Sequence, residues 1–91
     1  MSTIEETETD VETKEDIGKE KKLIIHNDDH HSFDFVIDAL MNICELDLEE
    51  SVQCTYIIHH RGKCVVKEGS EDKLKPMKKT LVDRGLRASL D

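Results

Sequence analysis

The stretch KKLIIHNDDHHSFDFVIDALMNIC, residues 21–44, decides the fold. Its first part, residues 21–27, has three consecutive apolar residues with β-branched side chains dominant, which is typical of a buried strand. A polar turn follows at residues 28–31, and His31 or Ser32 can cap what comes next. Apolar residues then recur at the spacing of one helix face, which predicts a helix over about residues 32–44; they are Phe33, Val36, Ile37, Leu40 and Cys44.

A second helix is predicted directly after a short connection. Asp47 is followed three residues later by Glu50, and this pair has the pattern of a capping box. The helix then runs to about His60, where Gly62 supplies a left-handed stop. The apolar run KCVVK at residues 63–67 predicts a second strand.

The last part of the chain predicts one more helix and one more strand. Ser70 can cap a helix that ends at Gly85, and Pro76 within it predicts a kink or a late start. Residues 86–90 alternate between apolar and polar, as a final strand does. The predicted fold class for residues 21–91 is therefore α+β, a single small domain with three strands and three helices in the order β-α-α-β-α-β.

The net charge of −8 is unevenly distributed along the chain. Residues 1–20 carry a net charge of −6 and only scattered apolar residues, so we expect a disordered acidic N-terminal extension. Residues 21–91 carry only −2 and no clustered lysines or arginines of the kind that nucleic acids or anionic membranes require. The sequence thus predicts no nucleic-acid partner and no membrane partner.

The location and the redox state follow from two further observations. The N-terminus lacks the basic-then-apolar order of a signal peptide, and no apolar run is long enough to span a bilayer. The three cysteines, Cys44, Cys54 and Cys64, form no CxxC pair and are odd in number. We therefore expect a cytoplasmic protein with reduced, partly buried thiols, and no metal or other cofactor.

Polar residues suited to binding a cation occur at two places. Asn27 and Asp28 end the first strand, and His59 lies near the end of the second helix. An amide oxygen, a carboxylate and a neutral imidazole nitrogen are all hydrogen-bond acceptors. Such a set suits a protein's free α-amino group, which is largely protonated near neutral pH. Apolar residues on the same elements can form a cup beside these acceptors: Phe33, Val36, Thr55 and Ile58.

These motifs resemble the ClpS family, the bacterial and plastid adaptors of the N-end rule pathway. The resemblance lies in NDDHHSFDFVIDAL (27–40), followed about twenty residues later by IHHRGK (58–63), and it covers residues 21–91. It implies a domain similar to the C-terminal domain of the ribosomal stalk protein. It also implies a monomeric, non-enzymatic adaptor that binds proteins with N-terminal Leu, Phe, Tyr or Trp and delivers them to a ClpAP-type ATP-dependent protease.

The resemblance also implies residue roles. Asn27, Asp28 and His59 would hold the α-amino group of the substrate. The apolar side-chain pocket would comprise Phe33, Val36, Thr55, Ile58 and Leu90, with Asp29 and His31 shaping its entrance and floor. The partner would be the N-terminal domain of a ClpA-type or ClpC-type AAA+ unfoldase, contacted by Lys75, while the extension at residues 1–20 is engaged by that machine.

The sequence departs from the family pattern inside the predicted pocket. Family members usually carry Thr-Pro-Met where this chain has His31, Ser32 and Phe33, and a Met where it has Thr55. Phe33 is bulkier and stiffer than Met, and Thr55 is smaller. These changes predict an altered pocket shape, so the sequence does not rank the N-terminal residues.

Three other interpretations remain open from the residues alone. A stalk-like interaction domain could have the same fold without binding N-termini. A metal-dependent hydrolase could use the turn of Asp28, Asp29, His30 and His31, although adjacent residues seldom converge on one ion. A Cys54–His59 pair could suggest nucleophilic catalysis, but five residues of helix place these side chains on different faces.

Overall fold

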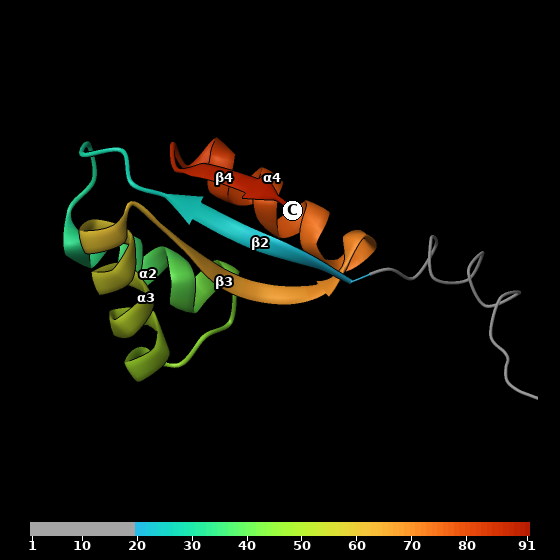
Figure 1. Cartoon of the computed structure of the whole chain (residues 1–91), viewed down its shortest axis with the longest axis horizontal. Helices are drawn as coiled ribbons and strands as arrows, with labels where there is room; N and C mark the ends of the chain where they lie inside the picture. Colours follow the sequence, from blue (N-terminus) through green and yellow to red (C-terminus); the bar gives the residue numbers. More distant parts are fainter. Residues whose placement is uncertain (1–19) are drawn as a thin grey trace, which may run out of the picture.

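A three-stranded antiparallel sheet carries the fold of the computed structural model, which describes residues 20–91 (Figure 1). Strand β2 (Glu20–His26) lies in the middle, β3 (Lys63–Ser70) on one edge and β4 (Arg87–Leu90) on the other. His26, the last residue of β2, is paired with Lys63 and with Arg87. Pairing with both edge strands therefore holds the end of β2 in place where the next loop begins.

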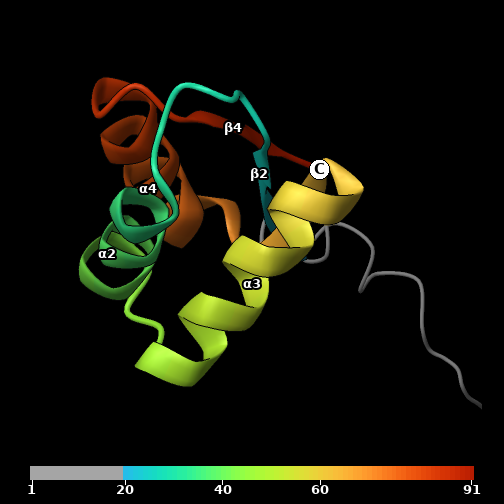
Figure 2. The ribbon, with the colours of Figure 1, turned by 90° about the vertical axis from the view of Figure 1, so that its left-hand side faces the viewer.

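Three helices complete the domain: α2 (Phe33–Ile43), α3 (Leu48–Arg61) and α4 (Glu71–Asp83). In Figure 1, α2 and α3 lie at the end of the sheet where β2 finishes, whereas α4 lies beside β4. Figure 2 shows the chain after β2 crossing over to α2, near the end of α3. The predicted β-α-α-β-α-β order is confirmed, and residues far apart in sequence meet at this end of the sheet.

The helices that position the site begin and end as the sequence predicted. The Ser32 hydroxyl caps α2 by accepting a hydrogen bond from the Phe35 backbone N–H at 3.1 Å. Asp47 and Glu50 form both halves of a capping box, with Glu50 N–H donating to the Asp47 carboxylate at 2.7 Å. Gly62 ends α3 in the left-handed conformation, φ 94°, which costs glycine little.

One predicted boundary was wrong, and one of the two alternatives given for Pro76 does not hold. Strand β3 continues to Ser70 instead of ending at Lys67, because residues 68–70 still pair with the start of β2. Helix α4 does not start late at Pro76, because the Ser70 hydroxyl accepts from Lys73 N–H at 3.3 Å and so caps a helix from Glu71. Pro76 lies inside that helix, where it removes a single backbone donor.

The core lies between the helices and one face of the sheet. Alternate residues of β2 point into it, and both Leu23 and Ile25 are essentially fully buried. The buried apolar residues are Leu23, Ile25, Val36, Ala39, Leu40, Cys44, Ile58, Val66, Leu74, Leu81 and Leu86. All three cysteines are free, as predicted.

Two sequence predictions concern other parts of the chain. The acidic extension predicted for residues 1–20 lies outside the described residues, except that Glu20 already belongs to β2. Within residues 20–91, none of the helices combines the length and the apolar character needed to cross a membrane.

Candidate functional site

A cavity of about 300 Å³ opens where the end of β2, the start of α2 and the last turns of α3 meet. Eight of the ten residues predicted for the binding site line it: Asn27, Asp28, His31, Phe33, Val36, Thr55, Ile58 and His59. His59 thus borders the same cavity as Asn27 and Asp28, more than thirty residues away in sequence. Four further residues complete the lining: Ile25, His26, Ser32 and Leu86.

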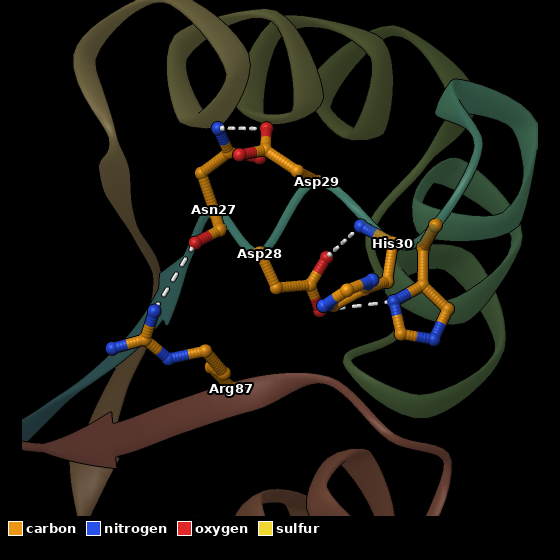
Figure 3. A network of polar contacts seen from close by, with 6 residues as sticks. Asn27, Asp28, Asp29, His30 and Arg87 are labelled. Carbon is orange, nitrogen blue, oxygen red and sulfur yellow. Dashed lines mark hydrogen bonds and ion pairs between the residues drawn. The ribbon is translucent and has the colours of Figure 1, made fainter.

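Both carboxylate oxygens of Asp28 are engaged by its own loop. Its Oδ1 accepts a hydrogen bond from the His30 backbone N–H at 3.0 Å, and its Oδ2 lies 2.9 Å from His31 Nδ1 (Figure 3). Burial by itself would raise the pKa of Asp28. The bonds from His30 and His31 and the nearby histidine charges outweigh this effect, so the pKa lies below its ordinary value. Asp28 is therefore a carboxylate at neutral pH, and each oxygen keeps a further lone pair for a ligand.

His31 is held in place on three sides. Besides its contact with Asp28, its ring stacks on Phe35 with centroids 4.5 Å apart and an angle of 20° between planes. The backbone of Gly85 approaches so closely that a Cβ there would lie 3.2 Å from His31 Nε2. His31 therefore orients Asp28. This role is additional to shaping the entrance or floor of the pocket, which the resemblance implied for His31.

Asn27 joins the cavity to the sheet. Its backbone N–H donates to the Gly62 carbonyl at 2.8 Å, and its carbonyl accepts from Arg87 Nη1 at 3.4 Å (Figure 3). Its side-chain nitrogen donates to Asp29 Oδ1 at 3.2 Å. An amide nitrogen is a hydrogen-bond donor and cannot bind a cationic ligand, which is itself a donor. Asn27 can therefore bind such a ligand only through its amide oxygen.

Two of the ten predicted residues do not line the cavity. Asp29 has a left-handed backbone, φ 63°, which aspartate tolerates better than most residues, and its carboxylate contacts Asn27 instead. Leu90 is paired with Leu23, toward the other end of β4 from the His26–Arg87 pair. Leu86 lies just before β4 at the site end, so it takes the lining position that the resemblance implied for Leu90.

The apolar wall is formed by α2 and α3. Val36 and Ile58 are buried, whereas Phe33 is 38% exposed and its ring meets that of His59 edge-on, with centroids 6.0 Å apart. The Thr55 hydroxyl donates to the Ser51 carbonyl of its own helix at 2.7 Å. That bond turns the hydroxyl away from a ligand, so Thr55 acts as a small and largely apolar wall residue.

Within residues 20–91, the catalytic and metal interpretations gain no support. Burial and the neighbouring Cys64 raise the pKa of Cys54 to about 12, so its thiol is protonated at neutral pH and is a poor nucleophile. Among residues 20–91, no three His, Cys, Asp or Glu side chains are arranged to hold a metal ion. Oriented acceptors beside an apolar hollow are suited to binding a ligand.

Lys75 lies on α4, outside this cavity. Its ammonium group is 3.7 Å from the Glu71 carboxylate one turn earlier, and the Lys75 side chain is 67% exposed. It borders a shallow depression along α4 together with Lys78, Lys79 and Val82. Contact between this surface and a partner stays a prediction.

The fold and cavity define a small α+β binding domain, and comparisons with known proteins identify its family. Residues 16–89 match the family described as "ATP-dependent Clp protease adaptor protein ClpS". The chain belongs to the ClpS family. This family consists of protease adaptors and not of enzymes, in agreement with the prediction from sequence.

Individual relatives support the same family. The Clp protease adapter ClpS of Campylobacter jejuni strain 81-176 is 45% identical over 56 residues, which are 62% of this chain and 58% of that protein. ClpS of Serratia proteamaculans is 36% identical over 44 residues, 48% of this chain and 42% of that protein. The chain thus aligns with less than two thirds of the length of these relatives.

A solved structure has the same fold. Agrobacterium tumefaciens ClpS2 bound to L-phenylalaninamide superposes with a TM-score of 0.68 at 22% identity, covering 80% of this chain and 95% of that one. This likeness supports the α+β fold.

Proposed function

We propose that this chain is an adaptor that binds the first residue of proteins beginning with Leu, Phe, Tyr or Trp and delivers them to a ClpAP-type protease. One observation carries the proposal: Asn27, Asp28 and His59 border a single cavity that also has apolar lining residues, which are Ile25, Phe33, Val36, Ile58 and Leu86. The acceptors would hold the α-amino group, and the hollow would take the first side chain.

The electrostatics of Asp28 support an amine as the ligand. A carboxylate that is ionised and already oriented attracts a protonated amine by a charge-assisted hydrogen bond, about twice as strong as a neutral one. The ligand of Agrobacterium ClpS2, L-phenylalaninamide, combines an amino group with an apolar aromatic side chain. A ligand of that chemistry matches both halves of the cavity in this chain.

Delivery requires a second contact, with the N-terminal domain of a ClpA-type or ClpC-type unfoldase. We assign it to the surface around Lys75 on α4, which lies outside the cavity and can be contacted while the cavity is occupied. The N-terminal extension would add a further contact, but it lies outside the described residues. One chain holds the whole cavity, so a monomer is sufficient for recognition.

The proposal is tested by peptides that differ only in their first residue. Fluorescence anisotropy should show that peptides beginning with Leu, Phe, Tyr or Trp bind, whereas those beginning with Ser or Glu do not. N-acetylation of the Phe peptide should abolish binding, because it removes the positive charge that Asp28 attracts. Equal binding of all peptides, or binding that survives acetylation, would favour the stalk-like interaction domain instead.

A further inference from the structure

Two cysteines from different elements meet where α3 packs against β3. Cys54 lies three residues after the buried Ser51 and four before the buried Ile58, so it lies on the side of α3 that faces the core. Cys64 of β3 is paired with Ile25, and directly opposite residues of two antiparallel strands point to the same face of the sheet. Ile25 is buried under the helices, so Cys64 also points toward them.

The thiols of these two residues are in direct contact. Both side chains are half-buried and pack against the core, and the two thiols are close enough to form a hydrogen bond. The Cys64 thiol donates to the Val65 carbonyl, with Sγ and O 3.4 Å apart. The sulfur of Cys64 can then accept the proton of Cys54. The fold thus holds two free thiols together at the junction of a helix and a strand.

We propose that Cys54 and Cys64 are a redox pair that forms an intramolecular disulfide when the protein is exposed to a peroxide. The Cys64 thiolate attacks one oxygen of hydrogen peroxide, which gives a sulfenic acid, and the other oxygen leaves as water once it has gained two protons in all. The Cys54 sulfur then attacks the Cys64 sulfur, and the sulfenic oxygen leaves as a second water with the proton of Cys54. The two cysteines together lose two electrons and two protons.

The surroundings of the three cysteines determine this order of events. Burial and the neighbouring Cys64 raise the pKa of Cys54 to about 12, so Cys54 keeps its proton while Cys64 reacts. Oxidation of Cys64 to the sulfenic acid removes its negative charge, which is one of the causes of the raised pKa of Cys54. Cys44 is fully buried and stays out of the reaction, because burial raises its pKa to about 11.

The disulfide would change the wall of the cavity. Its sulfur atoms would be about 2.0 Å apart, closer than the two atoms of any hydrogen bond, so the bond would draw α3 toward β3. Thr55, which follows Cys54, and Ile25, which is opposite Cys64, both line the cavity. The oxidised chain should therefore have a narrower cavity and bind a large first side chain more weakly. This effect on binding rests on the proposed function, whereas formation of the disulfide does not.

Peptide mapping of the full chain after treatment with hydrogen peroxide tests the disulfide. The chain should lose the mass of two hydrogen atoms, and digestion without reductant should yield one pair of peptides joined through Cys54 and Cys64. Cys44 should remain a free thiol that iodoacetamide labels after unfolding in urea. In Cys54→Ser the sulfenic acid of Cys64 has no thiol to react with, so dimedone should label it. Bridges that involve Cys44, or that form only between two chains, would overturn the proposal.

Fluorescence anisotropy tests the effect on the cavity. The oxidised wild type should bind a Phe-starting peptide at least several-fold more weakly than the reduced protein, and dithiothreitol should restore the affinity. Cys54→Ser is the matched control, because it cannot form the bridge and should bind equally well before and after peroxide. Equal affinities of the oxidised and reduced wild type would show that the bridge leaves the cavity unchanged. Failure of both forms to bind would instead contradict the proposed function, while the mapped disulfide would stand.

Discussion

At the scale of single residues, Asp28 has the largest expected effect on binding. Asp28→Asn keeps the shape of the side chain but removes its charge. We expect the Phe-starting peptide to bind about 10- to 100-fold more weakly, since hydrogen bonds to charged groups contribute roughly 1.5–3 kcal/mol. Fluorescence anisotropy measures this change. Asp38→Asn, at an exposed position on α2, is the matched control and should bind like the wild type. Equal affinity of both variants would remove Asp28 from the site.

The lowered pKa of Asp28 predicts how stability depends on pH. The folded pKa is below that of the unfolded chain, so the ionised carboxylate stabilises the fold at pH values above the unfolded pKa, about 3.9. This stabilisation is lost as the pH falls through the lower, folded pKa.

Urea unfolding of the wild type and of Asp28→Asn should therefore give free energies that differ at neutral pH. The difference should shrink only below about pH 3.9, the ordinary pKa of aspartate. A difference that disappears already at higher pH would contradict a lowered pKa for Asp28.

At the scale of elements, substitutions at two glycines can distinguish the effect of local backbone strain from the effect of displacing a residue of the site. Gly62 and Gly85 both have φ 94°, but only at Gly85 would a Cβ approach His31, at 3.2 Å. Each change to Ala should destabilise the fold by roughly 1–2 kcal/mol, the cost of a left-handed backbone in an L-residue. Only Gly85→Ala should also weaken peptide binding, because it displaces His31 and with it Asp28. Urea unfolding and anisotropy on both variants measure the two effects. If Gly62→Ala weakened binding just as much, strain alone would explain the result.

The sequence predicted those elements whose signals are local. Asp47 and Glu50 are three residues apart, and that spacing alone was enough to place the start of α3. The predicted cap at Ser70 is confirmed. Of the two alternatives given for Pro76, the late start does not occur, because the cap at Ser70 and the buried Leu74 keep the first turns of α4 helical. The end of β3 was missed because pairing with β2 is a long-range contact.

The residues of the site can likewise be divided into those that local sequence signals predicted and those that depend on long-range contacts. Asn27, Asp28 and His59 were chosen from motif and residue chemistry, and the fold brings them to one cavity. The roles of His31, Asp29 and Leu86 depend on contacts between distant segments: a ring beside Gly85, a carboxylate on Asn27, and the register of β4. The sequence had no local signal for these contacts.

At the scale of the whole molecule, the rate at which the buried thiols are modified reports whether the folded domain opens. Burial raises the pKa of Cys44 to about 11, and burial together with Cys64 raises that of Cys54 to about 12. Only the thiolate reacts with disulfide reagents, so both residues should be modified slowly at neutral pH in the folded protein and rapidly in urea. Mass spectrometry of peptides after timed labelling locates the modified cysteines. Fast labelling of Cys44 without denaturant would show that the core opens locally.

The carboxylate of Asp28 is held in position by its own loop before any ligand binds. Its two oxygens are already held by His30 and His31, and β3 and β4 brace the strand from which that loop departs. A receptor preset in this way loses little conformational freedom on complex formation, so more of the attraction remains as affinity. A small domain with few contacts to offer can in this way bind a small ligand, such as the α-amino group proposed for this cavity.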